Sequence, residues 1–231
     1  MIDFHCHFLP GIDDGASDAA ESAEILNRLK NQQVHTVVAT PHYIPDTEDI
    51  ESFLSRREAA YEKVQGIVPD GMRILRGAEV HISPELLECN GIGKLCTENS
   101  SCILLEMPYS VWQQWMFDVV LKVQADGITP VIAHAERYCE SLNLFKYKRF
   151  FEYENIYMQF NAESFLTMSG RRVVKAFADR DVSMILGSDA HNLRGRRPKM
   201  DKAKKNIVSR FGEDVFEKMK NNAEKLLIKS V

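Results

Sequence analysis

Seven short apolar runs are spaced along this chain, and most are followed by a longer segment in which apolar residues recur at helical intervals. Predicted strands occupy residues 2–5, 34–40, 73–77, 102–105, 128–133, 156–160 and 182–186. Predicted helices occupy residues 17–32, 47–68, 111–126, 140–154 and 169–180, with a stub at 84–96 and two helices that break near Gly212 within 199–228. Ser17 is a suitable N-cap for the first helix. Strands that alternate with helices predict an α/β fold with a parallel sheet, and seven such units suggest closure into a barrel.

Metal-binding side chains follow six of the seven predicted strands. The residues at these strand ends are His5 and His7, His42, Glu79, Glu106, His134, Asp189 and His191. Five of the seven histidines in the chain are among them, far more than chance placement would supply. His5 and His7 are two residues apart, so on a strand they project from one face. Because the carboxyl ends of parallel strands meet at one end of a barrel, we expect these side chains to converge there.

The chemistry of this set is that of a metal centre. With Asp14 there are nine candidate ligands, too many for one tetrahedral ion and suited to two or three ions that share a bridging carboxylate. Imidazole and carboxylate ligands without thiolate favour manganese, iron or zinc. Two ions about 3.5–4 Å apart can generate a hydroxide and clamp both oxygens of an in-line displacement at phosphorus. Arg137, Arg194, Arg196 and Arg197 follow ligand positions closely, which points to a phosphate ester as substrate.

Composition limits the class of protein. The chain has 231 residues, of which 45% are hydrophobic, and this suits a single domain over 1–231 with a buried core. A net charge of −4 and the lack of a basic stripe disfavour nucleic acid as a partner, and no apolar run approaches the roughly 18 residues of a membrane span. The five cysteines form no C-x-x-C pair, their odd count argues against a disulfide framework, and no secretory signal is visible. These features predict a cytoplasmic, reduced protein.

Seven motifs together resemble the PHP (polymerase and histidinol phosphatase) superfamily. In chain order they are His5-x-His7, Asp13-Asp14-Gly15, Thr40-Pro41-His42, Gly77-Ala78-Glu79, Leu105-Glu106-Met107-Pro108, His134-Ala135-Glu136-Arg137 and Ser188-Asp189-Ala190-His191-Asn192. Within the superfamily, the chain is most similar to bacterial manganese-dependent tyrosine-protein phosphatases of capsule and exopolysaccharide gene clusters. Glu106 matches this branch, whereas many PHP enzymes have histidine there. Ala135 departs from it, since the branch usually has proline in H-P-E-R, and we expect the change to alter loop stiffness rather than ligation.

The resemblance implies a distorted seven-stranded (βα)7 barrel of the TIM type that holds three divalent ions, with manganese first among Mn, Fe, Zn and Mg. The implied ligands are His5, His7, Glu79 and Asp189 for a first ion, Glu79, Glu106 and His134 for a second, and Asp14, His42 and His191 for a third. Arg137 and Arg196 match the phosphate-binding arginines of the family.

The implied reaction is hydrolysis of phosphotyrosine in a protein, and the implied substrate is a tyrosine kinase that regulates polysaccharide export. A metal-bridging hydroxide attacks phosphorus in line, while the third ion and the arginines neutralise the phosphoryl oxygens. Tyrosine leaves with a pKa of about 10, so it needs less protonation than an alkyl alkoxide. Asp189 and His191 are both candidates for the assisting acid, and the sequence does not choose between them.

Other functions fit parts of the same pattern. A small-molecule phosphatase such as histidinol-phosphate phosphatase would use the same centre, but Glu106 and the short chain weigh against it. A nuclease is disfavoured by the acidic charge. An inactive, metal-stabilised binding module is disfavoured because every ligand position is kept. C-x₅-R, the signature of cysteine phosphatases, does not occur at any of the five cysteines.

Several further residues have two interpretations. His81 could support the metal site or lie in an ordinary loop. Asn161 ends the sixth predicted strand, where it could bind substrate or stabilise the loop. Trp112, Trp115 and Phe117 could rim a cleft that accepts an aromatic group, although their helical spacing favours packing in the core.

Overall fold

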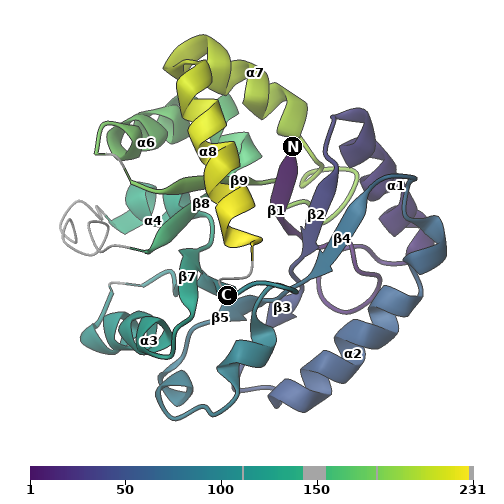
Figure 1. Cartoon of the computed structure of the whole chain (residues 1–231), viewed down its shortest axis with the longest axis vertical. Helices are drawn as coiled ribbons and strands as arrows, with labels where there is room; N and C mark the ends of the chain where they lie inside the picture. Colours follow the sequence, from purple (N-terminus) through teal and green to yellow (C-terminus); the bar gives the residue numbers. More distant parts are fainter. Residues whose placement is uncertain (111, 143–154, 181, 229–231) are drawn as a thin grey trace.

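Parallel strands form the centre of the molecule and helices surround them (Figure 1). The computed structural model describes residues 1–110, 112–142, 155–180 and 182–228. One sheet has the strand order β1-β2-β4, with β1 at Ile2–Cys6, β2 at Thr36–Ala39 and β4 at Arg73–Arg76. The other has the order β3-β5-β6-β7-β8-β9, with β3 at His42–Tyr43, β5 at Glu79–His81, β6 at Cys102–Glu106, β7 at Thr129–Ile132, β8 at Tyr157–Asn161 and β9 at Met184–Gly187. Each pair of neighbouring strands is parallel, which confirms the predicted α/β class.

The described residues contain nine strands in two sheets, so the predicted count of seven strands is wrong, and the strands do not pair as one closed sheet. Two of the nine, β3 and β5, lie just beyond the ends of the predicted strands at 34–40 and 73–77. The break at Pro41 separates β2 from β3, because proline has no N–H to donate to the ladder. The break at Gly77 separates β4 from β5, and the Gly77 N–H donates to the Ala39 carbonyl at 2.8 Å. At each break the chain passes from the three-stranded sheet to the six-stranded sheet.

The first and last strands also meet. Cys6 and Ala190 form a single parallel bridge. On either side of it, the His7 N–H donates to the Ala190 carbonyl at 2.9 Å, and the Asp189 N–H donates to the His5 carbonyl at 2.8 Å. The carboxyl ends of β1 and β9, which are almost the full chain apart in sequence, therefore lie next to each other.

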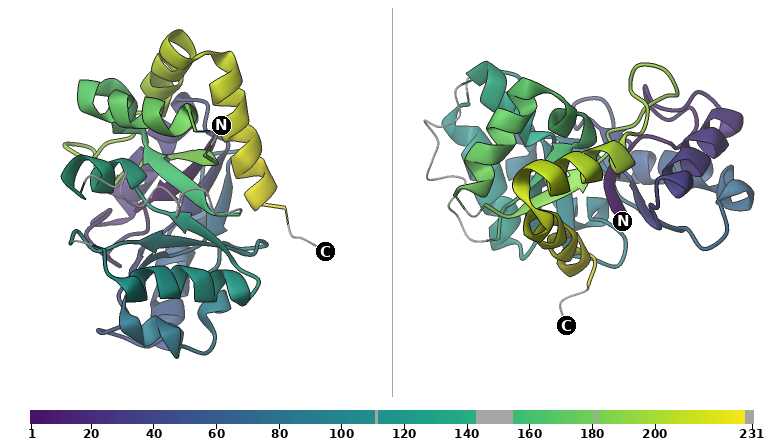
Figure 2. Two further views of the ribbon diagram at one scale, coloured as in Figure 1. Left: turned by 90° about the vertical axis from the view of Figure 1, so that its left-hand side faces the viewer. Right: turned by 90° about the horizontal axis from the view of Figure 1, so that it is seen from above.

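The helices lie outside the strands, as the predicted alternation requires (Figure 2). Their bounds are α1 Ala19–Asn31, α2 Ile50–Glu62, α3 Gln114–Ala125, α4 Ala135–Leu142, α6 Met168–Ala178, α7 Met200–Phe211 and α8 Glu213–Leu226, with short 3-10 turns η1 Gln65–Ile67, η2 Pro84–Leu87, η3 Ile92–Leu95 and η5 Ala162–Leu166. None of the helices among the described residues is long and apolar enough to cross a bilayer.

Most helix predictions are confirmed, with differences at their ends. The first helix is capped by Asp18 and not by Ser17: the Asp18 carboxylate accepts the Glu21 N–H at 2.9 Å. The break between the last two helices lies at Gly212, whose φ of 104° favours glycine. The helix predicted at 140–154 lies outside the described residues from position 143 onward.

Apolar side chains fill the space between the strands, and α8 closes one end of it. Phe4 and Val131 belong to a buried cluster of strand residues on which Leu226 of α8 packs. The Asn222 amide of α8 donates to the carbonyl of Met184 at the start of β9, at 3.0 Å. Because α8 lies at the amino ends of the strands, the carboxyl ends remain open to a functional site.

Candidate metal centre

All nine predicted ligands lie in one cluster at the carboxyl ends of the strands. Four stand on strands, namely His5 on β1, His42 on β3, Glu79 on β5 and Glu106 on β6. The other five lie in the segments that follow the strands, namely His7 and Asp14 after β1, His134 after β7, and Asp189 and His191 after β9. The parallel arrangement of the strands is what brings these distant positions together.

His5 and His7 present their Nε2 atoms to each other at 2.9 Å, and both atoms lie 3.0 Å from Oε2 of Glu79. The opposite ring nitrogens act as donors: Nδ1 of His5 donates to Oε1 of Gln159 at 2.9 Å, and Nδ1 of His7 donates to Oδ2 of Asp13 at 2.8 Å. In their neutral form, rings fixed in this way would direct two lone pairs at the same point. Because both rings are buried, a cation between them would satisfy the lone pairs and the carboxylate together.

Glu79 is the centre of the cluster. Its carboxylate also lies 2.9 Å from Nε2 of His134 and 3.3 Å from Nδ1 of His42. Glu106 is the next carboxylate, with its oxygens 3.5 Å from Nε2 of His134 and 3.9 Å from Nδ1 of His42. A carboxylate that faces histidines through both of its oxygens suits a bridging position between two ions.

The third part of the cluster borders solvent. Asp14, whose side chain is 62% exposed, lies 3.2 Å from Nε2 of His191 and 3.4 Å from Nε2 of His42. Nδ1 of His191 donates to the backbone carbonyl of Asp189 at 3.1 Å, so its Nε2 is left as an acceptor. This Nε2 is buried and has no hydrogen-bond partner among the described residues. An orphaned acceptor that faces a carboxylate fits a cation held between the two.

Three groups of these side chains place their ligand atoms within 4.8 Å of one another. They are His5, His7 and Asp189; His42, Glu79 and Glu106; and His7, Asp14, His42 and His191. The first and last resemble the ligand sets implied for the first and third ions. The middle group contains His42 where the implied second set has His134. All three groups combine imidazole and carboxylate, a donor set that fits a divalent metal ion.

Two arginines meet on one aspartate of the cluster. Nη2 of Arg137 pairs with Oδ2 of Asp189, and Nη2 of Arg196 lies 2.8 Å from Oδ1 of the same carboxylate. The Asn161 amide donates to Oδ2 at 2.7 Å, and Arg196 also contacts Asp14 at 3.2 Å. The side chains of the two arginines are 35% and 38% exposed, so a ligand can reach them from solvent.

The cluster holds protons in unusual places. Burial alone would lower the pKa of His7, but its hydrogen bonds to two carboxylates raise that pKa to about 10, and similar bonds raise the pKa of His134 to about 9. Burial would raise the pKa of Glu79, whereas the charge and hydrogen bonds of the facing histidines hold it well below its usual value. Burial and the neighbouring His7 lower the pKa of His191 to about 3, so its ring is neutral near pH 7. The raised pKa values favour protonated His7 and His134 in the metal-free protein, and a divalent cation would replace such protons, because metal binds deprotonated histidine.

The backbone is held in unusual conformations at two of the ligands. His134 has a φ of 31° and Asp189 a φ of 51°, both in the left-handed region that side-chain-bearing residues seldom adopt. Gly187, at the end of β9, lies against a third ligand, because an added Cβ there would stand 2.6 Å from Cβ of His5. The surrounding fold therefore fixes where these ligands stand.

Two residues that support the ligands were not identified from the sequence. Oε1 of Gln159 accepts the His134 N–H at 2.7 Å in addition to the His5 ring N–H, and its Nε2 donates to Oδ1 of Asn161 at 2.9 Å. Asp13 orients His7, although only its neighbour in the sequence was predicted to act. The available signal for Gln159 was its place two residues before Asn161 on a predicted strand, hence on the same face.

The structure resolves most of the residues that had two interpretations. Asn161 binds a candidate ligand, Asp189, and Nδ1 of His81 lies 3.3 Å from Oε2 of Glu106, so both support the site. Trp112 is only 4% exposed, and Trp115 and Phe117 pack against the core, as their spacing favoured. The remaining predicted arginines, Arg194 and Arg197, are exposed. Cys6, Cys89, Cys96 and Cys102 are free thiols.

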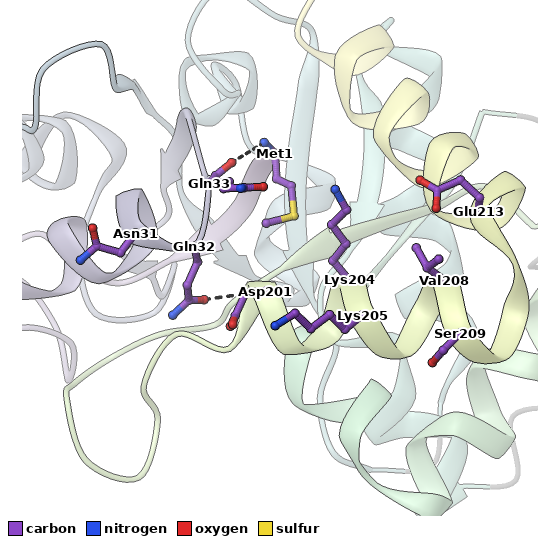
Figure 3. A pocket seen from close by; sticks show the side chains of 10 residues that line it. All are labelled: Met1, Asn31, Gln32, Gln33, Asp201, Lys204, Lys205, Val208, Ser209 and Glu213. Carbon is purple, nitrogen blue, oxygen red and sulfur yellow. Dashed lines mark hydrogen bonds between the residues drawn. The ribbon is translucent and has the colours of Figure 1, made fainter.

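A separate pocket of about 570 Å³ lies where α7 meets the N-terminus and the end of α1 (Figure 3). Its lining includes Met1, Gln32, Lys204, Lys205 and Glu213, and none of the predicted site residues lines it. This pocket and the candidate metal cluster are therefore in different places.

The chain has clear relatives. The family described as "Capsular polysaccharide synthesis, CpsB/CapC" matches residues 1–228. Tyrosine-protein phosphatase YwqE of Bacillus subtilis is 30% identical over 234 residues, covering 98% of this chain and 91% of that protein. Tyrosine-protein phosphatase CpsB of Streptococcus pneumoniae is 31% identical over 229 residues, covering 92% and 91%.

Solved structures agree with the sequence relatives. A crystal structure from work on YwqE and CpsB, described as unique metal-dependent tyrosine phosphatases, matches with a TM-score of 0.82 and 25% identity over 98% of this chain and 94% of that one. A phosphotriesterase homology protein from Escherichia coli matches with a TM-score of 0.59 and 12% identity over 98% of both chains, which shows a shared fold alone. The resemblance expected from the motifs is confirmed: this chain belongs to the CpsB/CapC family of capsular polysaccharide synthesis.

Proposed function

We propose that this chain is a metal-dependent protein-tyrosine phosphatase of capsular or exopolysaccharide synthesis. The observation that carries the proposal is a cluster of histidine and carboxylate side chains in which two arginines, Arg137 and Arg196, both bind the carboxylate of Asp189. Hydrolysis of a phosphate ester uses both features, because metal ions supply the nucleophile and guanidinium groups bind phosphoryl oxygens. The similarity to relatives named as tyrosine-protein phosphatases supports phosphotyrosine as the ester.

The proposed cofactors are three divalent ions, manganese first, with iron, zinc and magnesium as alternatives. Their proposed ligands are His5, His7, Glu79 and Asp189; Glu79, Glu106 and His134; and Asp14, His42 and His191. When bound, such ions supply a hydroxide at neutral pH and neutralise phosphoryl oxygens. Gln159 and Asp13 hold His5 and His7 in the tautomers that leave Nε2 available for ligation.

Arg137 and Arg196 are the proposed phosphate-binding residues. Both planar groups are held by the Asp189 carboxylate, and each can present two N–H donors to phosphoryl oxygens. Burial would raise the pKa of Asp189, but the charges of His5 and Arg137 hold it below its usual range. Asp189 therefore stays ionised and orients the guanidinium groups before substrate arrives.

The leaving group explains why an aryl ester is the better substrate. Asp189 and His191 are the two candidates for the assisting acid, but the first is ionised and the second has a pKa of about 3. Neither holds an acidic proton near pH 7, so both are assigned to metal binding first. A tyrosine phenolate, with a pKa of about 10, can leave with little protonation, whereas a serine alkoxide cannot.

The test is manganese-dependent release of phosphate from a phosphotyrosine peptide, a phosphoserine peptide of the same sequence, and histidinol phosphate. We expect turnover of the phosphotyrosine peptide that EDTA abolishes, manganese restores and His5→Ala removes. A preference for histidinol phosphate would instead make the chain a small-molecule phosphatase. If no ester turns over while metal is bound, the proposal fails and an inactive binding module remains.

The proposed partner is a phosphorylated tyrosine kinase of polysaccharide export. The match to a family of capsular polysaccharide synthesis supports this choice. The proposed location is the cytoplasm, where the tyrosines of such a kinase would be phosphorylated, and residues 1–231 are proposed to work as one domain.

A further inference from the structure

Tyr109 is an exposed aromatic residue at the edge of the metal cluster. It is 56% exposed, and it is the one aromatic residue among the exposed large hydrophobic side chains of the described residues. It follows β6 by three positions, so it lies at the carboxyl end of the strand that supplies Glu106. Exposed tyrosine surface is common, but this tyrosine lies beside His134, a buried candidate metal ligand.

The position of Tyr109 is fixed from both sides. Before it, the Met107 N–H donates to the hydroxyl of the buried Tyr138 at 3.0 Å, and Pro108 restricts the backbone. The Tyr109 ring lies 5.5 Å from the Tyr138 ring and 6.1 Å from the His134 ring, nearly parallel to the latter at 17°. The side chain is therefore held beside a ligand while more than half of the residue is open to solvent.

The hydroxyl of Tyr109 connects the ring to the phosphate-binding group. Nη1 of Arg137 donates to this hydroxyl at 3.0 Å, while Nη2 of the same guanidinium pairs with Asp189. A phosphoryl group bound by Arg137 thus has the Tyr109 ring as its neighbour on the side away from Asp189.

We propose that Tyr109 forms one wall of the site for the leaving group, where its ring packs against the aryl ring of phosphotyrosine. The inference rests on the proposed function and adds a specificity-determining residue to it. Aromatic rings prefer offset or edge-to-face contacts at centroid distances of about 4.5–7 Å, a range that an exposed tyrosine beside the phosphate position can reach. The short alkyl group of phosphoserine has no ring to make this contact.

The first test compares two phosphonates that cannot be hydrolysed, phenylphosphonate and methylphosphonate, as inhibitors of the manganese-loaded enzyme. They share a headgroup and differ in the ring. In Tyr109→Ala and Tyr109→Leu, we expect the inhibition constant of phenylphosphonate to rise about three- to tenfold and that of methylphosphonate to stay within about twofold. Tyr109→Phe keeps the ring, so it should keep the ratio of the two constants.

Turnover gives the matching measurement. In Tyr109→Ala, the KM for the phosphotyrosine peptide should rise by the same factor with kcat little changed, and the selectivity over the phosphoserine peptide should fall. Tyr61→Ala is the matched control, because Tyr61 also lies against an arginine, Arg76 at 5.1 Å, but stands on α2. Tyr61→Ala should leave unchanged both the ratio of the two inhibition constants and the selectivity for the phosphotyrosine peptide over the phosphoserine peptide.

The outcomes separate the two proposals. If wild-type enzyme turns over phosphotyrosine but Tyr109→Ala shifts both phosphonates equally, or shifts neither, the ring does not contact the leaving group and this inference is overturned alone. If the metal-loaded wild type releases no phosphate from phosphotyrosine, the proposed function fails and this inference fails with it.

Discussion

The metal cluster and the pocket beside α7 are built in opposite ways. In the cluster, His5 and His191 are fully buried, and the donors and acceptors of their rings are fixed by neighbours. In the pocket, about 570 Å³ of space is bordered by side chains that are all at least partly exposed. Figure 3 shows Lys204 and Lys205 extending from α7 without converging on a common point. Room for a ligand is therefore found in one region, and oriented chemical groups are found in the other.

This difference indicates which property identifies a reactive site. A buried acceptor without a donor, such as Nε2 of His191, costs free energy unless a ligand satisfies it, so its presence points to an occupant. An exposed lysine at a pocket wall is satisfied by water and points to none. Pairs of matched substitutions, one in each region, test whether this interpretation is right.

The largest effect is expected for Glu79→Gln. Glu79 faces four histidines through its two oxygens, and a neutral amide would offer metal ions one acceptor in place of a charged bridge. We expect phosphotyrosine turnover to fall on the order of a thousandfold, because metal ions supply several kcal/mol of transition-state stabilisation. Bound manganese per chain, measured by elemental analysis, should fall as well.

The matched control is Glu213→Gln, a carboxylate that lines the pocket and is exposed. Turnover and metal content should stay within about twofold of wild type, as surface substitutions usually change little. An equal loss in both variants would remove the distinction between the two regions.

A smaller effect is expected for Gln159→Met, which keeps the volume of the side chain and removes its polar atoms. The variant loses the acceptor for the His5 ring and the His134 backbone, so both ligands are less well oriented. Outer partners of metal ligands are typically worth about 10–100-fold in metal affinity or activity. Manganese titration followed by activity measures this directly.

Gln32→Met is the control for that substitution. Gln32 also bridges backbone groups, since its Oε1 accepts the Met200 N–H at 2.7 Å and its Nε2 donates to the Pro198 carbonyl at 3.1 Å. Its loss should lower the free energy of unfolding by ~1 kcal/mol and leave manganese affinity unchanged. A drop in manganese affinity here as large as that of Gln159→Met would mean that both act through general stability.

The convergence of the candidate ligands could be predicted from the sequence because all of them except Asp14 stand at or just after the end of an apolar run, where the rule for parallel strands is strong. The short strands β3 and β5, which follow Pro41 and Gly77, could not be predicted, since they have only 2 and 3 residues and sheet partners are set by tertiary packing. A local pattern predicts that a strand exists more reliably than it predicts the partner of that strand.

The supporting residues were harder to predict than the ligands. Gln159 and Asp13 act through contacts with residues whose positions depend on the whole fold, and the one local signal, the place of Gln159 two residues before Asn161, does not show which groups it contacts. Tyr109 was missed for another reason: aromatic residues further along the chain had the clearer pattern, and Trp112 proved to be buried. Exposure and orientation, which the sequence does not give, decide the role of such residues.

The smallest effect is expected in the pH dependence of stability, whose sign should differ between metal-free and manganese-loaded protein. Without metal, His7 has a folded-state pKa of about 10, above the 6.5 of the unfolded chain, because its bonds to Asp13 and Glu79 outweigh burial. Its contribution to stability is complete below pH 6.5 and is lost as the pH rises through 10. The melting temperature of protein in EDTA should therefore fall over this range, by about 2–4 °C for each kcal/mol lost.

The melting temperature of manganese-loaded protein should stay constant or rise over the same range, because deprotonated ligands bind metal more tightly. Asp13→Asn removes the carboxylate that contributes most to raising this pKa, so in EDTA the melting temperature of this variant should fall less steeply with pH than that of wild type. A wild-type slope in EDTA that matches the slope of Asp13→Asn would show that His7 does not hold its extra proton, and the argument that a cation replaces that proton would fall with it.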